Sequence, residues 1–234
     1  MAKKPERHAD CVEVIYDQKH WQLLRQLRSQ ALEIMEALAS ANMFSIVHGS
    51  VARGDVSKKS DVDVFLPEQS SSFAIETALE AAGFHAKRRT LVQATPAYAF
   101  KGYIELEEKS CVSFSLVKMR RTEGEFYKYG GAIELCTLKN DMRVAGVDKQ
   151  LMLIEPNTIG HVKSGIVGRE EEVARFLGVS TEIVHDRVRA LQRRDAIGRT
   201  GVFIERVLSS EETFEMVLEG LAGKNPAVRR RLRR

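Results

Sequence analysis

Apolar residues recur every three or four positions over residues 17–41, a spacing that predicts an amphipathic helix. A shorter segment, residues 73–82, has the same pattern and ends at Gly83, so it predicts a second helix. Shorter apolar runs, several of them alternating with polar residues, predict strands at 44–47, 62–65, 86–92, 98–106 and 111–118. Helices that alternate with strands in this order predict an α+β fold: a mixed sheet with helices on one face.

The pattern changes near Pro156, where the segment Pro-Asn-Thr-Ile-Gly is typical of a boundary between domains. We therefore expect a first domain over residues 1–156 and a second, mainly helical domain over residues 157–234. In the second, residues 170–177 and 181–196 predict two helices joined by a short turn that contains a glycine.

Two further elements are expected after these helices. The glycines at 198 and 201, followed by Val202-Phe203-Ile204, predict a short β-hairpin. A last amphipathic helix is expected to begin with Ser209 or Ser210 as its N-cap and to stop at Gly223.

The most informative chemistry lies at residues 49–63. Gly49-Ser50 leaves the strand at 44–47, and ten residues later Asp61 and Asp63 stand on either side of a valine. Residues i and i+2 of a strand project to the same face, so the two carboxylates are expected side by side. Adjacent carboxylates repel one another unless a cation lies between them. The pair therefore predicts a site for a divalent metal with oxygen ligands.

The turn before the acids suggests a phosphate ligand for the same site. Gly49 tolerates unusual backbone dihedrals and allows a ligand to approach the backbone closely. Ser50 adds a hydroxyl and a backbone N–H, and Arg53 carries a guanidinium that suits bidentate contacts to phosphate. A metal held by carboxylates and substrate phosphates is the usual way to bind a nucleoside triphosphate.

These residues resemble the signature of the polymerase-beta-type nucleotidyltransferase superfamily, and most closely its minimal nucleotidyltransferase branch. The resemblance rests on Gly49-Ser50, the ten-residue gap and Asp61-Val62-Asp63. It implies transfer of a nucleoside monophosphate from a triphosphate such as ATP to a hydroxyl acceptor, with Mg²⁺ or Mn²⁺ as cofactor. Asp61 and Asp63 would be catalytic metal ligands, and Gly49, Ser50 and Arg53 would bind the nucleotide.

The chain departs from the family pattern at one position. Members usually carry a third carboxylate on a later strand, but residues 111–117 have serines at 113 and 115 and no acid. Glu105 and Glu107, on the preceding strand, could replace it, and Glu105 is the candidate that we keep as a catalytic residue. Without a third acid, the domain would bind a nucleotide and transfer it slowly or not at all.

The two C-terminal helices and the glycine hairpin resemble a winged helix-turn-helix over residues 163–207. The resemblance implies binding of DNA or RNA, with the second helix in a major groove and the hairpin as a wing. Such domains also serve as protein-interaction and dimerisation modules. The expected nucleic-acid-binding residues are His185, Arg189, Arg193, Arg199, Arg229 and Arg230.

Charge is concentrated at the end of the chain. Five of the last six residues are arginines, and without them the formal net charge of +4 becomes −1. A short arginine cluster suits a phosphate backbone or an acidic partner, and it also suits a solubilising terminus.

Composition places the chain among ordinary globular proteins, with 44% apolar and 29% charged residues. No apolar run is long enough to span a membrane, and residues 1–7 lack the apolar core of a signal peptide. Three scattered cysteines indicate a reducing compartment, so we expect a cytoplasmic location.

Three functions are compatible with these patterns. The first is a nucleotidyltransferase whose acceptor is linked to a nucleic acid. The second is a DNA-binding regulator whose nucleotidyltransferase-like domain is weak or only senses a nucleotide. The third is modification of a protein hydroxyl. The expected partners are a nucleoside triphosphate and DNA or RNA, and a homodimer is a further expectation.

Overall fold

The computed structural model describes residues 11–107, 109–198 and 201–233. The chain divides into two compact units, and each is built from segments that are distant in sequence. Unit 1 comprises Met1–Ser29, Val47–Ser60 and Gly124–Thr200. Unit 2 comprises Gln30–Ile46, Asp61–Glu123 and Gly201–Arg234.

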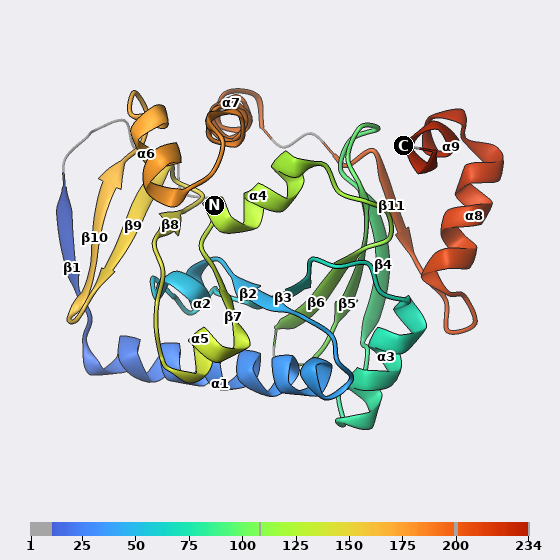
Figure 1. Ribbon diagram of the computed structural model, residues 1–234, viewed down its shortest axis with the longest axis horizontal. Coiled ribbons are helices and arrows are strands. Elements are labelled where there is room, and N and C mark those ends of the chain that lie inside the picture. The colour runs from blue at the N-terminus through green and yellow to red at the C-terminus, as the bar shows by residue number, and fades with distance from the viewer. Residues whose placement is uncertain (1–10, 108, 199–200, 234) are drawn as a thin grey trace. The chain divides into compact units, whose positions relative to one another are not determined.

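Unit 1 contains a four-stranded antiparallel sheet in the order β1-β10-β9-β8 (Figure 1). The strands are β1 (Val12–Ile15), β8 (Gly146–Val147), β9 (Met152–Asn157) and β10 (Gly160–Gly165). The boundary that we expected at residue 156 falls inside the β9–β10 hairpin, where Pro156 pairs with His161. Proline is tolerated there because it stands near the end of its strand.

Helices α6 (Glu170–Leu177) and α7 (Thr181–Ile197) pack against this sheet through one apolar cluster. The cluster joins Val147 and Leu153 of the strands to Val173 of α6 and Val184 of α7. Gly178, at φ +62°, ends α6, and the Ser180 hydroxyl caps α7 by accepting a hydrogen bond from Ile183 N (3.4 Å). The two helices and the glycine turn between them are therefore present as predicted.

Unit 1 also holds the shorter elements around the glycine turn. They are α2 (Ser50–Arg53), β7 (Ala132–Glu134) and α5 (Leu135–Lys139). Three elements have ends in both units: α1 (Gln18–Ser40), β2 (Ile46–His48) and α4 (Arg121–Tyr129). The helix predicted over residues 17–41 matches α1 closely. Strand β7 ends at Glu134, because a helical turn begins at Leu135.

Unit 2 contains a mixed sheet with the strand order β11-β4-β5-β6-β3 (Figure 1). Its strands are β3 (Val62–Leu66), β4 (Arg88–Gln93), β5 (Phe100–Glu105), β6 (Ser110–Ser115) and β11 (Ile204–Val207). β3 runs parallel to β6, and the other described pairs are antiparallel. The predicted α+β class with a mixed sheet is confirmed.

The two faces of this sheet differ because its side chains alternate. One face carries buried apolar residues such as Ile104, Val112 and Phe114. Helices α3 (Ser72–Ala81) and α8 (Phe214–Lys224) cover it, with Phe114 and Phe214 in edge contact at 5.1 Å. The opposite face carries the candidate site and is mostly polar, with Phe65 on it as a fully buried exception that pairs with Ser113. We call it the polar face, and it includes Asp63, Lys101, Tyr103, Glu105, Cys111, Ser113 and Ser115.

The end of the chain is more ordered than we expected from its sequence. α8 begins after Thr213, whose hydroxyl accepts from Met216 N (3.2 Å), so neither Ser209 nor Ser210 is its N-cap. A further helix, α9 (Pro226–Leu232), contains three of the five terminal arginines. Proline occupies its first turn, where a missing N–H costs nothing.

None of the helices in the described ranges is both long and apolar enough to cross a membrane.

Candidate functional site

The two aspartates lie at the beginning of β3 in unit 2. Asp61 directly precedes the strand and is exposed, whereas Asp63 is half-buried within it. Val62 and Val64, which point to the opposite face, are fully buried. This alternation holds both carboxylates on the polar face, as the i, i+2 spacing predicts.

Strand register places Cys111 between Asp63 and Glu105. Asp63 pairs with Cys111 of β6, and Cys111 pairs with Glu105 of β5. In-register neighbours share a face, so the three side chains form a row across the strands. Two strand spacings separate the backbones of Asp63 and Glu105, which is about 10 Å. Glu105 thus shares a face with Asp63, but it is too far away to lie directly beside the aspartates. The residue is exposed.

The side chain beside Asp63 is thus a thiol, which we did not identify from the sequence. The serines at 113 and 115 share its face, but their hydroxyls are turned to the backbone. Ser113 Oγ donates to Val64 O (3.5 Å), and Ser115 Oγ donates to Val117 O (2.6 Å). The i, i+2 series Cys111, Ser113 and Ser115 indicates only that these side chains share a face, because strand register decides which of them lies beside Asp63.

The carboxylates set the electrostatics of this face. Burial raises the pKa of the Cys111 thiol to about 12, and the negative charges of Asp63, Glu105 and Asp61 contribute in the same direction. Burial and the charges of Cys111 and Asp63 likewise raise the pKa of Tyr103 to about 12. Both groups are therefore uncharged near neutral pH, and the local field favours a cation.

The carboxylates of Asp61 and Asp63 suit a metal ion whose other ligands come from a bound substrate and from water. Within the described residues, no group of three His, Cys, Asp or Glu side chains is arranged to hold a metal ion. Mg²⁺, however, is commonly held by one or two carboxylates and completed by substrate phosphates and water. Asp61 and Asp63 fit that donor set, because both are oxygen ligands on one face in a region of negative potential.

The glycine turn lies in unit 1 and is held by backbone hydrogen bonds. Gly49 has φ +77°, its N–H donates to Gly131 O (2.8 Å), and its carbonyl accepts from Arg53 N (3.0 Å). A Cβ at Gly49 would meet nothing within 4 Å, so it is the backbone conformation that favours glycine here. The turn thus exposes backbone without a side chain in front of it.

Ser50 closes the loop that leads to the acids. Its hydroxyl donates to Ser60 Oγ (3.0 Å), and Ser60 Oγ also accepts from Ser57 N (3.0 Å). Ser60 is the residue immediately before Asp61 in the chain. The ten-residue gap of the motif is therefore a closed loop whose two ends are hydrogen-bonded.

Arg53 is engaged inside unit 1. Its Nε and Nη2 donate to the two carboxylate oxygens of Asp55 (3.0 and 2.9 Å), and its Nη1 donates to Gly130 O (2.5 Å). Only 5% of the residue is exposed. Its contact with phosphate stays a prediction, whereas its contact with the loop acid Asp55 was not anticipated.

The expected nucleic-acid-binding residues lie in different parts of the molecule. His185, Arg189 and Arg193 are on α7 in unit 1; His185 Nε2 is 3.6 Å from a Glu171 oxygen, and the two arginines are exposed. Arg199 lies outside the described residues.

Arg229 and Arg230 are on α9 in unit 2. Arg229 donates to the carbonyls of Ala222 and Gly223 (3.1 and 2.9 Å) at the end of α8, and Arg230 is exposed.

The strand expected in a wing belongs to another sheet. β11 pairs with β4 in antiparallel register from Ile204–Gln93 to Val207–Thr90. These residues have strand propensity, as we predicted, but their hydrogen bonds go to the edge of the unit 2 sheet. The described residues therefore show the two helices of a helix-turn-helix without the predicted wing.

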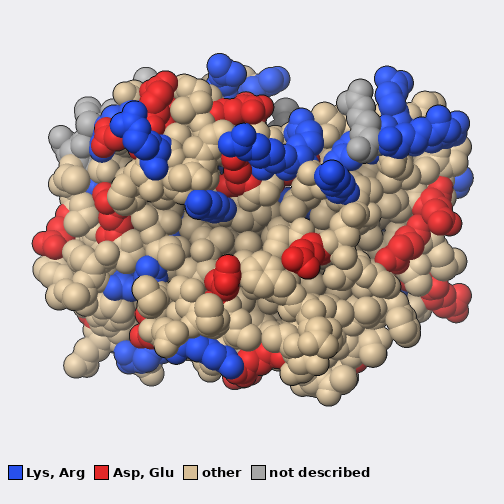
Figure 2. Space-filling model, in the orientation of Figure 1, with Lys and Arg blue, Asp and Glu red and all other residues tan. Residues whose placement is uncertain are grey.

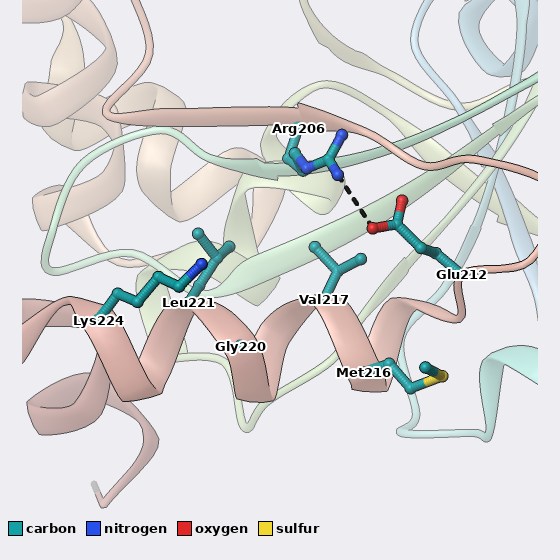
Figure 3. Close-up of a pocket in the computed structure, with 7 residues that line it drawn as sticks. All are labelled: Arg206, Glu212, Met216, Val217, Gly220, Leu221 and Lys224. Atoms are coloured by element: carbon teal, nitrogen blue, oxygen red, sulfur yellow. Dashed lines mark hydrogen bonds and ion pairs between the residues drawn. The ribbon is translucent and has the colours of Figure 1, made fainter.

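A shallow hollow of about 220 Å³ lies between β11 and α8 (Figure 3). Arg206 and Glu212 form an ion pair at its side (2.9 Å), and Val217 and Leu221 lie along α8. This volume is below the roughly 300–1,000 Å³ of most ligand pockets, so the hollow does not compete with the acid pair as a functional site.

Comparison with known proteins gives one match. Residues 28–121 match the family model described as a nucleotidyltransferase domain, of the polymerase-beta type. The matched segment contains Gly49, Ser50, Asp61, Asp63, Glu105 and Cys111 and ends at the start of α4. Searches of curated proteins and of solved structures found no significant match.

Proposed function

We propose that the protein transfers a nucleoside monophosphate from a nucleoside triphosphate to a hydroxyl acceptor with the help of a divalent metal. The observation that carries the proposal is the convergence of Asp61, Asp63 and Glu105 around Cys111 on the polar face. A cluster of negative charge on a sheet face favours a cation, and a metal ion bound with a nucleotide supplies one. The nucleotidyltransferase match over the same residues supports this assignment.

The glycine turn supports the same proposal through chain connectivity. Ser50 is hydrogen-bonded to Ser60, and Ser60 is joined to Asp61 by a peptide bond that keeps their Cα atoms about 3.8 Å apart. We therefore assign Gly49 and Ser50 to the phosphates of the triphosphate. Arg53 would act as a positioning residue, because it ties the turn to Asp55 and Gly130.

Asp61 and Asp63 would hold Mg²⁺ or Mn²⁺. When bound, the metal supplies positive charge that offsets the charge developing on the leaving pyrophosphate. The acceptor oxygen attacks the α-phosphorus, a new P–O bond forms, and the bond to pyrophosphate breaks. Glu105 is our candidate to accept the proton from the acceptor hydroxyl.

The test is the double variant Asp61→Asn with Asp63→Asn. We expect loss of metal-dependent transfer of label from an α-³²P-labelled triphosphate, by at least about a hundredfold, the size of effect seen when one electrostatic group is removed from an active site. The matched control is Glu107→Gln, which removes an exposed carboxylate of unit 2 that is paired with Lys87. Unchanged transfer in the double variant would remove the acid pair from the site.

A second function is favoured by one observation, the capped helix-turn-helix of α6 and α7. A DNA-binding regulator would use the triphosphate as a signal and leave it intact. Calorimetry with each triphosphate, combined with an assay of pyrophosphate release, separates the two. Binding without release favours the regulator, and release favours the transferase.

A further inference from the structure

Strand β11 forms an edge of the unit 2 sheet. Its residues, Ile204–Val207, pair with β4 on one side, and no strand of the described residues pairs with them on the other side. A strand in this position presents N–H and C=O groups to which a further strand can bind. Val207 is 40% exposed here, and Phe203, just before the strand, is 41% exposed. Apolar side chains beside an edge of this kind are typical of a surface that a partner covers.

The hollow between β11 and α8 lies directly beside this edge (Figure 3). Arg206 pairs with Leu91, which is fully buried, so the Arg206 side chain projects to the face that α8 covers. Val217 and Leu221 of α8 line the hollow on the other side. Because side chains alternate along a strand, a strand added to β11 would direct every second side chain towards this hollow. Its volume of about 220 Å³ suits such side chains better than a complete small-molecule ligand.

Gly220 keeps the hollow open on the side of α8. Met216 lies four residues before it and Lys224 four residues after it, so the three residues share one side of the helix. Glycine is unfavourable in the interior of a helix, and a Cβ at Gly220 would meet nothing within 4 Å. Packing among the described residues therefore does not require glycine at this position. Its effect is to leave part of the hollow without a side chain.

The charge of the hollow is positive at one end. Among the described residues that line it, Glu212 carries the only carboxylate, which is already paired with Arg206 (2.9 Å). Lys224 lines the other end and forms no ion pair with any residue that the structure describes. Arg229 of α9 donates to carbonyl groups at this end of α8, and Figure 2 shows Lys and Arg side chains gathered over the position of α9. A carboxylate of a docked segment is therefore favoured near Lys224.

We propose that the groove between β11 and α8 binds an extended internal segment of a partner protein, which adds to β11 as a further strand. The segment carries an aliphatic side chain that enters the hollow over Gly220 and an acidic side chain that contacts Lys224. This interaction goes beyond the proposed function, because it uses neither the acid pair nor a nucleotide. It makes unit 2 the part of the chain that recognises a protein.

Two features favour an extended segment over a docked helix or a nucleic acid. An added strand satisfies the main-chain groups of a sheet edge with its own main chain, whereas the main chain of a helix is already hydrogen-bonded to itself. The side of the hollow that α8 supplies is mainly apolar, with Met216, Val217 and Leu221. A phosphate backbone instead requires a series of cations along its path.

The probe is a phage-displayed library of random peptides about 12 residues long, which exceeds the usual length of a strand. It is selected on the full chain and, in parallel, on the variant Gly220→Leu, which fills the hollow. The matched control is Gly223→Leu, at a second glycine of α8 that does not line the hollow and whose Cβ would also meet nothing within 4 Å. Both variants should unfold at a higher urea concentration than the wild type, because leucine favours a helix more than glycine does. Loss of binding in Gly220→Leu would therefore not result from unfolding.

We expect the wild type to enrich peptides in which an aliphatic residue stands close to an acidic one. Fluorescence anisotropy of these peptides, synthesised with blocked ends, should show binding at least about tenfold weaker for Gly220→Leu and within about twofold of the wild type for Gly223→Leu. Lys224→Glu should weaken binding about tenfold, because it places like charges together. The same peptides enriched on Gly220→Leu, or undiminished binding to either Gly220→Leu or Lys224→Glu, overturns the proposal.

A scan of N-methylated peptides tests the addition of a strand directly. Each methyl group removes one main-chain N–H donor, and in an antiparallel pair these donors reach the neighbouring strand from alternate residues. Methylation should therefore weaken binding at least about fivefold at every second position and have little effect at the positions between. A uniform response along the peptide overturns the proposal.

Sedimentation of the free chain excludes another occupant of the groove. We expect the wild type and Gly220→Leu to sediment with the same mass. A wild-type dimer that Gly220→Leu dissociates would identify a second copy of the chain as the occupant and overturn the proposal.

Discussion

The two halves of the motif at residues 49–63 are built in different ways. In the turn half, residues 49–60, the polar groups of Ser50 and Arg53 are hydrogen-bonded to other groups of unit 1. In the acid half, Asp61 and Asp63 stand with Glu105 near a thiol whose pKa is raised first by burial and then by their charges. The polar groups of the turn half are hydrogen-bonded within the protein, whereas the acid half concentrates negative charge.

This difference indicates a division of labour. Groups whose hydrogen bonds are satisfied within the protein stabilise a conformation, and groups of like charge placed together cost stability until a ligand neutralises them. Substitutions in the turn half should therefore act first on stability. Substitutions in the acid half should act first on metal and substrate binding.

The largest effect is a loss of stability, which is expected from Arg53→Ala. Removing the guanidinium leaves the partly buried Asp55 without its partner, and breaking a buried pair from one side costs about 3–5 kcal/mol. Urea unfolding followed by circular dichroism measures this loss. Arg53→Lys keeps the charge but not the fork, so it should lose less. A fully stable Arg53→Ala with impaired triphosphate binding would instead make Arg53 a direct phosphate ligand.

A smaller effect is expected from Cys111→Asp, which should raise the affinity for a metal ion and lower the stability of the metal-free protein. A carboxylate beside Asp63 should tighten Mn²⁺ binding about tenfold, comparable to the influence of one well-placed partner at a metal site. The same carboxylate adds like charge, so the metal-free protein should unfold at lower urea concentration. Calorimetry and urea unfolding measure the two quantities, and Cys111→Ser is the control. Unchanged Mn²⁺ affinity would show that Cys111 lies outside the metal site.

The smallest effect is a dependence of stability on pH, which we expect from His161 in unit 1. His161 is buried and hydrogen-bonded to the Tyr16 hydroxyl through Nδ1 (2.7 Å), and burial holds its pKa below the ordinary value. Below about pH 6.5 the unfolded chain takes up a proton that the folded chain does not, so stability falls as pH falls. The urea midpoint of the wild type should decline from pH 7 to 5.

The variant His161→Asn isolates this contribution. It keeps a polar partner for Tyr16 and has no titrating ring, so its midpoint should decline less over the same interval. Parallel declines in the two proteins would exclude His161 as the source.

Local patterns predicted the elements well. α1, β3, α6 and α7 lie within one or two residues of their predicted positions, because apolar periodicity and caps are local signals. The common face of Asp61 and Asp63 was also expected from their i, i+2 spacing, whereas their role as metal ligands stays a prediction. The predictions of the elements and of the acid pair both depend on residues that are close in sequence.

Contacts between distant residues could not be predicted. The position of Cys111 beside Asp63 depends on strand register, and a shift of one residue would have turned it to the other face. The pairing of Arg53 with Gly130 and of β11 with β4 likewise joins segments far apart in the chain. α9 was overlooked because a run of arginines carries little apolar periodicity, and its stability comes from the buried contacts of Arg231 and Val228.

The pairing of β11 with β4 has a consequence for how the chain folds during synthesis. β4 is made more than a hundred residues before its outer neighbour, and loop closure over such a separation is slow. Until residue 207 has emerged, β4 presents an open edge to which other nascent chains can add a strand. The sheet that carries the acid pair is therefore among the last parts of the molecule to be completed.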